Sequence, residues 1–252
     1  MTLDAQTVLI TGAGAGVGRG IALAVATAGA DVIVAARGDS GQQVVDEIRA
    51  RGARAWWARC DVTDLDSVTQ AIALALNATG RLDAVIHNAT SNRSSSPHQL
   101  CDVDEALWED HVSVSLRGAY HCAHAAFDAL SDGGGTLVVM TSPAGIEGSA
   151  TLPLYATVKG ALRGFAKSLA REWAPAGITV NAVSPLAYSP AMTNGIKADP
   201  AMEDRLAKRV PMGRVGDPET DVGAAVALLI DPAARFITGQ TIGIDGGHFT
   251  SV

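Results

Sequence analysis

The chain has 252 residues, of which 48% are hydrophobic and 18% are charged, and its formal net charge at pH 7 is −7. This length and hydrophobic content suit one large globular domain and exclude intrinsic disorder. An acidic balance without a cluster of Lys or Arg argues against nucleic acid as a partner.

Strand-like and helix-like segments alternate along the chain. Short apolar or β-branched runs predict strands at 7–11, 31–35, 55–58, 84–87, 136–141, 179–183 and 241–244. Helical spacing of apolar residues predicts helices at 18–28, 41–51, 64–77, 104–130, 155–173 and 221–229, with a break near Asp110 left open. Two stretches, 91–97 and 187–211, are expected to be irregular, and loops of this length in a compact domain are usually functional or mobile. Repeated β-α-β units predict an α/β fold, a doubly wound parallel sheet with helices on both faces.

A glycine-rich turn follows the first predicted strand. Residues 11–18 read Thr-Gly-Ala-Gly-Ala-Gly-Val-Gly, and an apolar helical pattern begins directly after them. Strand, turn and helix form the context in which a pyrophosphate binds, because glycines let the backbone approach it and the first helical amides are free. A tight turn without a ligand is the plainer alternative for such a motif alone.

Tyr155 and Lys159 lie four residues apart in a predicted helix and therefore share one face. An ammonium beside a phenol favours the phenolate and lowers its pKa, which is ordinarily near 10. The pair then gives and takes a proton near neutral pH, while the Ser142 hydroxyl holds a substrate oxygen. Taken alone, the pattern also suits an exposed lysine beside a packed tyrosine.

Several further motifs occur in one order along the chain. The full set is Thr11-Gly12-x-x-x-Gly16-x-Gly18, Cys60-Asp61-Val62, His87-Asn88-Ala89-Thr90, Ser142 with Tyr155-x-x-x-Lys159, Asn181-Ala182-Val183-Ser184-Pro185, and Ile237-Thr238-Gly239-Gln240-Thr241 with Asp245-Gly246-Gly247. With these motifs at these distances, the chain from Thr7 to about Gly247 resembles the short-chain dehydrogenase/reductase family. The resemblance implies a Rossmann-like fold in which residues 1–252 form one NAD(P)-binding domain. It also implies reversible hydride transfer between a nicotinamide cofactor and a carbonyl or secondary alcohol.

The resemblance assigns roles to single residues. Ser142, Tyr155 and Lys159 are the expected catalytic residues, and Ser115 stands where the family usually has an asparagine that completes a proton relay. The expected cofactor contacts are Gly12, Gly14, Gly16, Val17, Gly18, Arg37, Asp61, Val62, Asn88, Ala89, Tyr155, Lys159 and Pro185. The expected substrate contacts are Ser142, Leu186, Tyr188 and Met192, which favour a hydrophobic ketone or alcohol.

The end of the second strand bears on the choice of cofactor. Ala36 fills the position where relatives that prefer NAD carry an aspartate, and Arg37 follows it. Because a guanidinium pairs with a phosphate, we expect NADP(H) to be favoured over NAD(H). Arg37 covering only the adenine ring is the alternative, and Ala15 provides no second basic residue.

Three departures from the family pattern leave other functions open. Besides Ser115, a leucine replaces the usual glycine at Leu186, and Pro190 replaces a threonine expected to meet the carboxamide. A 3-oxoacyl-reductase-like enzyme and a non-catalytic NADP-binding protein of the same fold are therefore alternatives. A lyase on the same scaffold fits less well, because Ser142, Tyr155 and Lys159 are all present with the full glycine turn.

The remaining features indicate an intracellular enzyme. The three cysteines are widely spaced and suit reduced, packed thiols, and neither a signal peptide nor a membrane-spanning segment is expected. His121 and His124 are expected on a helix surface or at a subunit contact, and no metal is assigned. The expected protein is cytoplasmic and acts on a small molecule, and the family implies a homotetramer, with a dimer as the alternative.

Overall fold

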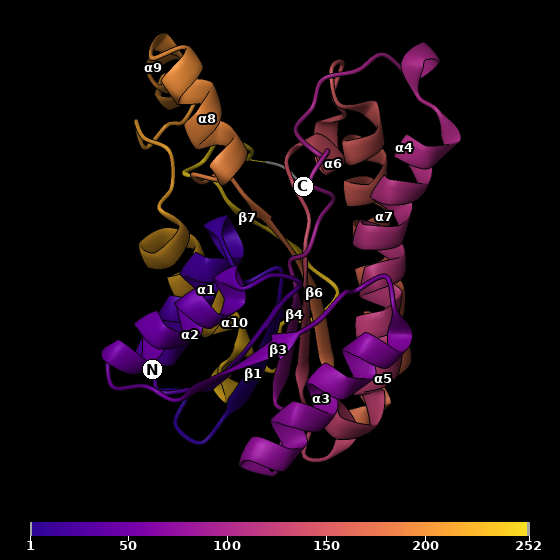
Figure 1. Ribbon diagram of the computed structural model, residues 1–252, viewed down its shortest axis with the longest axis vertical. Coiled ribbons are helices and arrows are strands. Elements are labelled where there is room, and N and C mark those ends of the chain that lie inside the picture. Colours follow the sequence, from indigo (N-terminus) through magenta and orange to yellow (C-terminus); the bar gives the residue numbers. More distant parts are fainter. Residues whose placement is uncertain (1, 251–252) are drawn as a thin grey trace.

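Seven short strands rich in Val, Ile and Ala form one parallel sheet in the computed structural model, which describes residues 2–250 (Figure 1). They are β1 (Thr7–Thr11), β2 (Asp31–Ala36), β3 (Ala55–Arg59), β4 (Ala84–His87), β5 (Thr136–Met140), β6 (Thr179–Pro185) and β7 (Thr241–Ile244). Their order in the sheet is β3-β2-β1-β4-β5-β6-β7. The predicted α/β class with a doubly wound parallel sheet is confirmed.

Helices connect the strands. The α-helices are α1 (Gly16–Thr27), α2 (Ser40–Ala50), α3 (Leu65–Thr79), α4 (Glu105–His111), α5 (Gly118–Ser131), α6 (Ala144–Glu147), α7 (Pro153–Trp173), α8 (Pro190–Ala198), α9 (Ala201–Ala207) and α10 (Ala224–Ile230). Short 3₁₀ turns are η1 (Leu100–Asp102), η3 (Ala174–Ala176) and η5 (Pro232–Ala234), and the wider π-turns are η2 (Val112–Arg117) and η4 (Pro218–Gly223).

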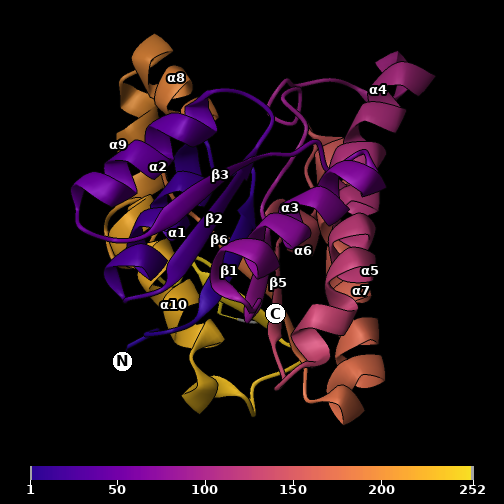
Figure 2. The same cartoon turned by 60° about the horizontal axis from the view of Figure 1, so that its bottom comes forward.

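Both faces of the sheet are apolar because successive strand residues point to opposite sides. Leu9 of β1 belongs to the core beneath α3, α5 and α7, whereas its neighbours Val8 and Ile10 belong to the core beneath α1, α2 and α10. The two helical layers lie on opposite sides of the sheet in Figures 1 and 2. Within the part of the chain that the structure describes, no helix is both long and apolar enough to cross a membrane.

Two predicted segments differ in the structure. The stretch 187–211 is not irregular, because it contains α8 and α9, whose prolines stand at helix starts. Pro190 begins α8 behind Ser189, whose hydroxyl accepts the N–H of Met192 at 3.2 Å. The helix expected at 104–130 does not break near Asp110, and instead continues from α4 through the π-turn η2 into α5.

The order of the strands reverses between β1 and β4. The chain adds β2 and β3 on one side of β1 and the remaining strands on the other, so β1 and β4 become neighbours with Thr11 opposite His87. Sheets of this kind bind ligands beyond the carboxyl ends of the strands at such a switch point. We therefore expect a ligand site at the edge of the sheet that carries Thr11 and His87.

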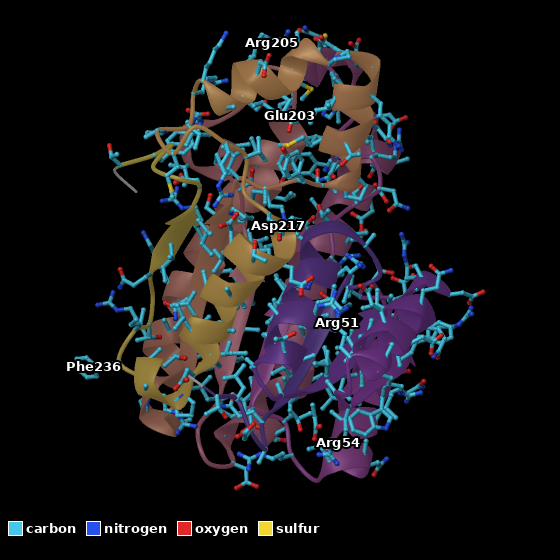
Figure 3. The ribbon with its side chains drawn as sticks, turned by 90° about the vertical axis from the view of Figure 1, so that its left-hand side faces the viewer. Arg51, Arg54, Glu203, Arg205, Asp217 and Phe236 are labelled. Atoms are coloured by element: carbon cyan, nitrogen blue, oxygen red, sulfur yellow. The ribbon has the colours of Figure 1, made fainter. Side chains whose placement is uncertain are left out.

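The helix behind the glycine-rich turn is held by close packing against η4. A Cβ added to Gly20 would lie 2.4 Å from the carbonyl carbon of Pro218, so the two backbones touch. Arg51 adds ion pairs to Glu47 at 3.1 Å and to Glu219 at 2.5 Å near the same junction (Figure 3). Exposed ion pairs contribute at most about 1 kcal/mol, so backbone contact is the larger determinant of this junction.

Gly20→Ala is expected to destabilise the fold by about 1–3 kcal/mol, because the added methyl forces α1 and η4 apart. The measurement is the midpoint of urea unfolding. Gly164→Ala is the matched control, since this exposed glycine of α7 has nothing within 4 Å of an added Cβ and should gain about 0.5–1 kcal/mol. Equal stability of the Gly20→Ala variant and the wild type would contradict the packing argument.

Candidate active site

The predicted site residues follow the carboxyl ends of four neighbouring strands. The glycine-rich turn leaves β1, Asn88 follows β4, Ser142 follows β5, and Pro185 ends β6. Because these strands are parallel and adjacent, their ends meet at one edge of the sheet.

The glycine-rich turn is shaped by contacts that exclude side chains. Gly12 has φ +63°, and a Cβ there would lie 2.8 Å from Cα of Ala89. Gly16 has φ +55°, and its Cβ would lie 2.7 Å from Cδ of Pro190. The side-chain amide of Asn88 donates to the carbonyls of Thr11 at 3.2 Å and Gly12 at 3.1 Å, which holds the turn against β4.

The start of α1 fits a bound pyrophosphate. Ala15 is the N-cap residue, and among the described residues no side chain caps the first amides of α1. Its first turn also carries no acidic residue. Uncapped amides at the positive end of a helix dipole attract an anion, so these residues are suited to hold the diphosphate of a dinucleotide cofactor.

Tyr155 and Lys159 lie on the first turns of α7, as their spacing predicted. The Lys159 Nζ is 5.6 Å from the centre of the Tyr155 ring. Lys159 is 3% exposed, and its Nζ donates to the carbonyl of Met140 at 2.7 Å. The Thr141 hydroxyl donates to the Lys159 carbonyl at 2.7 Å, so the end of β5 fixes this turn of α7 and brings Ser142 alongside it.

The direction of the Tyr155 pKa differs from the sequence expectation. Burial raises the pKa of Tyr155, and the hydrogen bond with the Ser142 hydroxyl is what opposes that rise. Lys159 was expected to lower it, but burial instead lowers the pKa of Lys159 itself to about 8. The reason is that removing both groups from water favours the neutral form of each.

Ser115 lies in the π-turn η2 and is completely buried. Its hydroxyl is 3.3 Å from the Thr90 hydroxyl, and its carbonyl is 2.9 Å from Nε2 of His87. His87 and Thr90 stand where the family resemblance implies the asparagine and glycine of an Asn-Asn-Ala-Gly motif; the sequence shows this departure but predicts no role for either residue.

The residues expected at the adenine end lie on β2 and β3 or just after them. Arg37 is exposed, and within the described chain it forms no ion pair, whereas the nearby Asp39 pairs with Arg59 at 2.9 Å. The Asp61 carboxylate accepts hydrogen bonds from Thr63.

The adjacent Val62 contacts a histidine that is buried, not exposed. Its carbonyl lies 2.8 Å from Nδ1 of His121. His121 was expected on a helix surface or at a subunit contact, but it is buried within the chain, where its ring reaches this segment.

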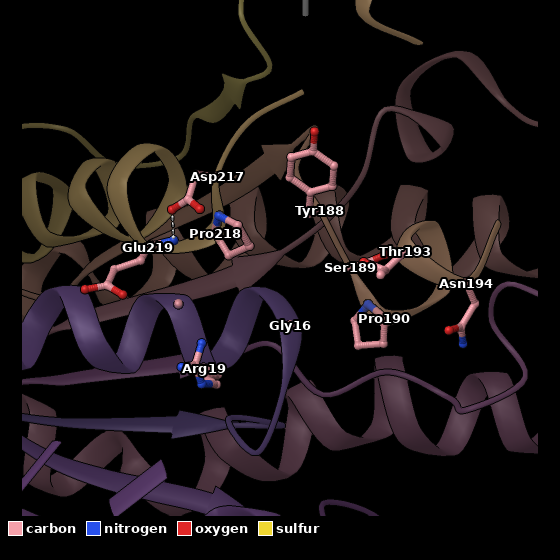
Figure 4. Close-up of a pocket in the computed structure, with 11 residues that line it drawn as sticks. Gly16, Arg19, Tyr188, Ser189, Pro190, Thr193, Asn194, Asp217, Pro218 and Glu219 are labelled. Atoms are coloured by element: carbon pink, nitrogen blue, oxygen red, sulfur yellow. Dashed lines mark hydrogen bonds between the residues drawn. The ribbon is translucent and has the colours of Figure 1, made fainter. Parts of the chain in front are cut away.

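Of the expected substrate residues, Leu186 and Tyr188 lie between β6 and α8, Met192 lies in α8, and Ser142 follows β5. The backbone of Leu186 pairs with Ile244 and Gly216, and the Tyr188 hydroxyl hydrogen-bonds the carboxylate of Glu203 in α9. A cavity of about 320 Å³ lies between α1, the start of α8 and the start of η4 (Figure 4). Gly16 and Tyr188 line it, but Ser142, Tyr155, Lys159, Leu186 and Met192 do not.

A family model, a curated relative and two solved structures are all similar to this chain over nearly its whole length. Residues 12–248 match the family model described as enoyl-(acyl carrier protein) reductase. A 3-oxoacyl-[acyl-carrier-protein] reductase from Synechocystis is 35% identical over 248 residues, covering 97% of each chain. A short-chain type dehydrogenase/reductase from Mycobacterium ulcerans has a TM-score of 0.91 at 28% identity, covering 98% of this chain and 91% of that one. A 3-ketoacyl-(acyl-carrier-protein) reductase from Brucella melitensis, complexed with NADH, has a TM-score of 0.88 at 29% identity, covering 98% of this chain and 99% of that one.

Lys159→Met is expected to stabilise the fold while removing a candidate catalytic charge. Burial depresses the pKa of Lys159 from 10.5 to about 8, a cost of roughly 3 kcal/mol. Below pH about 8 that cost is complete, and it disappears as the pH rises toward 10.5, because the unfolded chain binds more protons in this window. The excess stability of the variant should therefore be largest below pH 8 and shrink above it.

The measurement is the free energy of unfolding of wild type and variant at several pH values. The hydrogen bond to Met140 that the variant loses does not titrate in this range, so the pH dependence of the difference isolates the charge. A difference that stays constant from pH 7 to above 10 would show that Lys159 is not buried as a charged group.

Proposed function

This chain belongs to the short-chain dehydrogenase/reductase family and is an NAD(P)-dependent oxidoreductase, and we propose that Ser142, Tyr155 and Lys159 carry its reaction. The observation that supports this most is the placement of Tyr155 and Lys159 on one face of α7 beside the end of β5. The reaction is reversible hydride transfer between NADP(H) and a carbonyl or secondary alcohol. Residues 1–252 act as one domain.

Ser142, Tyr155 and Lys159 have different roles in the proposed reaction. The Ser142 hydroxyl holds that oxygen, and the Tyr155 hydroxyl gives or takes its proton. The nicotinamide, when bound, supplies or accepts the hydride. The Lys159 ammonium binds the ribose hydroxyls of the cofactor and stabilises charge on the phenol oxygen.

The pKa shifts of Tyr155 and Lys159 favour carbonyl reduction over alcohol oxidation at neutral pH. Because burial raises the pKa of Tyr155, the phenol keeps its proton at neutral pH and is ready to act as a general acid. Lys159, with a pKa of about 8, is mostly protonated at the same pH and favours a negative charge developing nearby. Oxidation of an alcohol needs the phenolate and should require a higher pH.

NADP(H) is the preferred cofactor in this proposal. Ala36 leaves room for a 2′-phosphate at the end of β2, and the exposed Arg37 can pair with it. Asp39 in the following turn forms an exposed ion pair with Arg59, which offsets the negative charge of that carboxylate. NAD(H) is the alternative, since a relative from Brucella melitensis is described as complexed with NADH.

The substrate class follows from the segment before and within α8. Leu186, Tyr188 and Met192 are half-buried there and favour a hydrophobic ketone or alcohol. A 3-oxoacyl thioester of an acyl carrier protein is the second candidate, supported by the name of the Synechocystis relative. A non-catalytic NADP-binding protein, suggested by Ser115, Leu186 and Pro190, would bind NADPH without turnover of any carbonyl or alcohol.

A cytoplasmic homotetramer is the proposed assembly, with a dimer as the alternative. Exposed aromatic side chains gather on α4 and α5, where Trp108, Tyr120 and Phe127 lie. A second exposed apolar set, Phe236 and Ile237, lies just before β7, and Phe236 projects away from the ribbon in Figure 3. Two separate apolar surfaces are what an assembly with two kinds of contact requires. Light scattering of the purified protein tests the tetramer against the dimer.

Tyr155→Phe is expected to lower turnover by about 10²–10⁴-fold, because the ring remains but the transferable proton is lost. NADPH binding, measured by fluorescence titration, should stay close to that of the wild type. Steady-state kinetics with a panel of hydrophobic ketones and 3-oxoacyl thioesters measure the rate. Turnover at the wild-type rate would rule out the proposed role of Tyr155.

Ala36→Asp is expected to weaken NADPH binding at least about tenfold, because a carboxylate would face the 2′-phosphate, and to shift preference toward NADH. Arg37→Ala should weaken NADPH more than NADH, since only NADPH has this phosphate. Titration of wild type and both variants with each cofactor is the measurement. Equal weakening of both cofactors by Arg37→Ala would make Arg37 an adenine-covering residue and overturn the NADP(H) assignment.

A further inference from the structure

His87 is a buried imidazole at the meeting point of three elements. It is the last residue of β4 and is 1% exposed. Its ring nitrogens face Thr11 at the end of β1, Ser115 in the π-turn η2 and Cys122 in α5. No step of the proposed reaction uses it, yet its position joins the cofactor loop to the catalytic side of the site.

The partners of His87 determine which nitrogen carries the proton. Nε2 lies 2.9 Å from the carbonyl oxygen of Ser115, and a carbonyl only accepts, so Nε2 is the donor. In a neutral ring Nδ1 is then an acceptor, and the Thr11 hydroxyl lies 3.2 Å from it. Burial lowers the pKa of His87 to about 3, so the ring is neutral at working pH. Both nitrogens are occupied, and His87 therefore takes no part in proton transfer itself.

The Nδ1 side of the His87 ring orients the backbone that follows β1 and β4. Because the Thr11 hydroxyl donates to Nδ1, its lone pairs face the backbone N–H groups of Asn88 at 3.1 Å and Ala89 at 3.2 Å. Asn88 in turn holds the carbonyls of Thr11 and Gly12. This side of the ring therefore fixes the backbone on which the cofactor loop rests.

The Nε2 side orients the π-turn. Carbonyls in a π-turn depart from the regular α-helical ladder, and a side-chain donor can hold one of them in place. His87 does this for Ser115, whose own hydroxyl then lies 3.3 Å from that of Thr90. The turn packs against α7, which carries Tyr155 and Lys159. This side of the ring therefore fixes a pair of hydroxyls next to the catalytic helix.

We propose that His87 is a positioning residue with two separable functions: its Nε2–H holds Ser115 for proton transfer, and its Nδ1 holds Thr11 for cofactor binding. The first function rests on the proposed catalytic role of Tyr155 and Lys159, and on Ser115 completing their proton relay as the family resemblance implies. The second is independent of turnover, since it concerns the shape of the cofactor loop alone.

Two amide substitutions separate the functions. In His87→Gln the side-chain amide reaches the place of Nε2 and can still donate to Ser115, but nothing accepts from Thr11. In His87→Asn the amide oxygen can accept from Thr11, but the side chain is too short to reach Ser115, and asparagine is the usual residue of the family motif here. We expect His87→Gln to bind NADPH and NADH at least about fivefold more weakly with kcat nearly unchanged. We expect His87→Asn to keep cofactor affinity and lose at least about fivefold in kcat.

The controls keep the two readouts apart. Thr69→Val removes an exposed α3 hydroxyl that bonds only the Leu65 carbonyl at 2.9 Å, and should change neither kcat nor cofactor affinity. If a His87 variant does not fold, Thr11→Val against Thr11→Ser tests the cofactor function and Thr90→Val against Thr90→Ser tests the Ser115 function, with serine expected to restore each. Parallel loss of kcat and affinity in both His87 variants, or no loss in either, would overturn the proposal. The kinetics of Tyr155→Phe test the proposed reaction by itself. Cofactor titration of His87→Gln needs no turnover, so it tests the second function of His87 even if the proposed reaction is wrong.

Discussion

The pairing of β1 with β4 at their carboxyl ends is the constraint on which the rest of the site depends. Where parallel strands end, their backbone groups lose ladder partners and need others. Here the hydroxyl of Thr11 and the side-chain amide of Asn88 supply them. The glycine-rich turn is consequently held in one shape by the protein itself, so cofactor binding does not have to order it.

Burial of charge at the end of β5 is the second constraint, and it works against stability. Lys159 has the Met140 carbonyl as its hydrogen-bond partner, and its pKa falls to about 8 as a result of burial. Close packing compensates, since a Cβ at Gly145 would lie 2.6 Å from the Lys159 carbonyl carbon, which leaves α6 and α7 in backbone contact. Groups with a pKa near working pH are common at functional sites, so the burial that weakens the fold agrees with the catalytic role proposed for Lys159.

The sequence predicted features that depend on local pattern and missed those that depend on burial. Every strand was predicted to within about two residues, because short β-branched runs between turn residues leave few alternatives, and the spacing of Tyr155 and Lys159 predicted their shared face. The direction of the Tyr155 pKa could not be predicted, because spacing says nothing about solvent access. The burial of His121 depends in the same way on a partner, Val62, that is distant in sequence. The helix α8 was missed because its proline was weighed as a departure from the family pattern and not as a helix start.

Three departures from the family pattern, at His87, Thr90 and Ser115, meet in space. His87, Thr90 and Ser115 come from different segments, yet the His87 ring contacts the Ser115 carbonyl and the Thr90 hydroxyl lies beside that of Ser115. His87 and Thr90 thus both contact Ser115 in the π-turn η2, which packs against the helix that carries Tyr155 and Lys159. A neutral His87 that donates through Nε2 and accepts through Nδ1 satisfies the Ser115 carbonyl and the Thr11 hydroxyl at once, so the unusual residues of this corner leave neither of these buried groups without a partner.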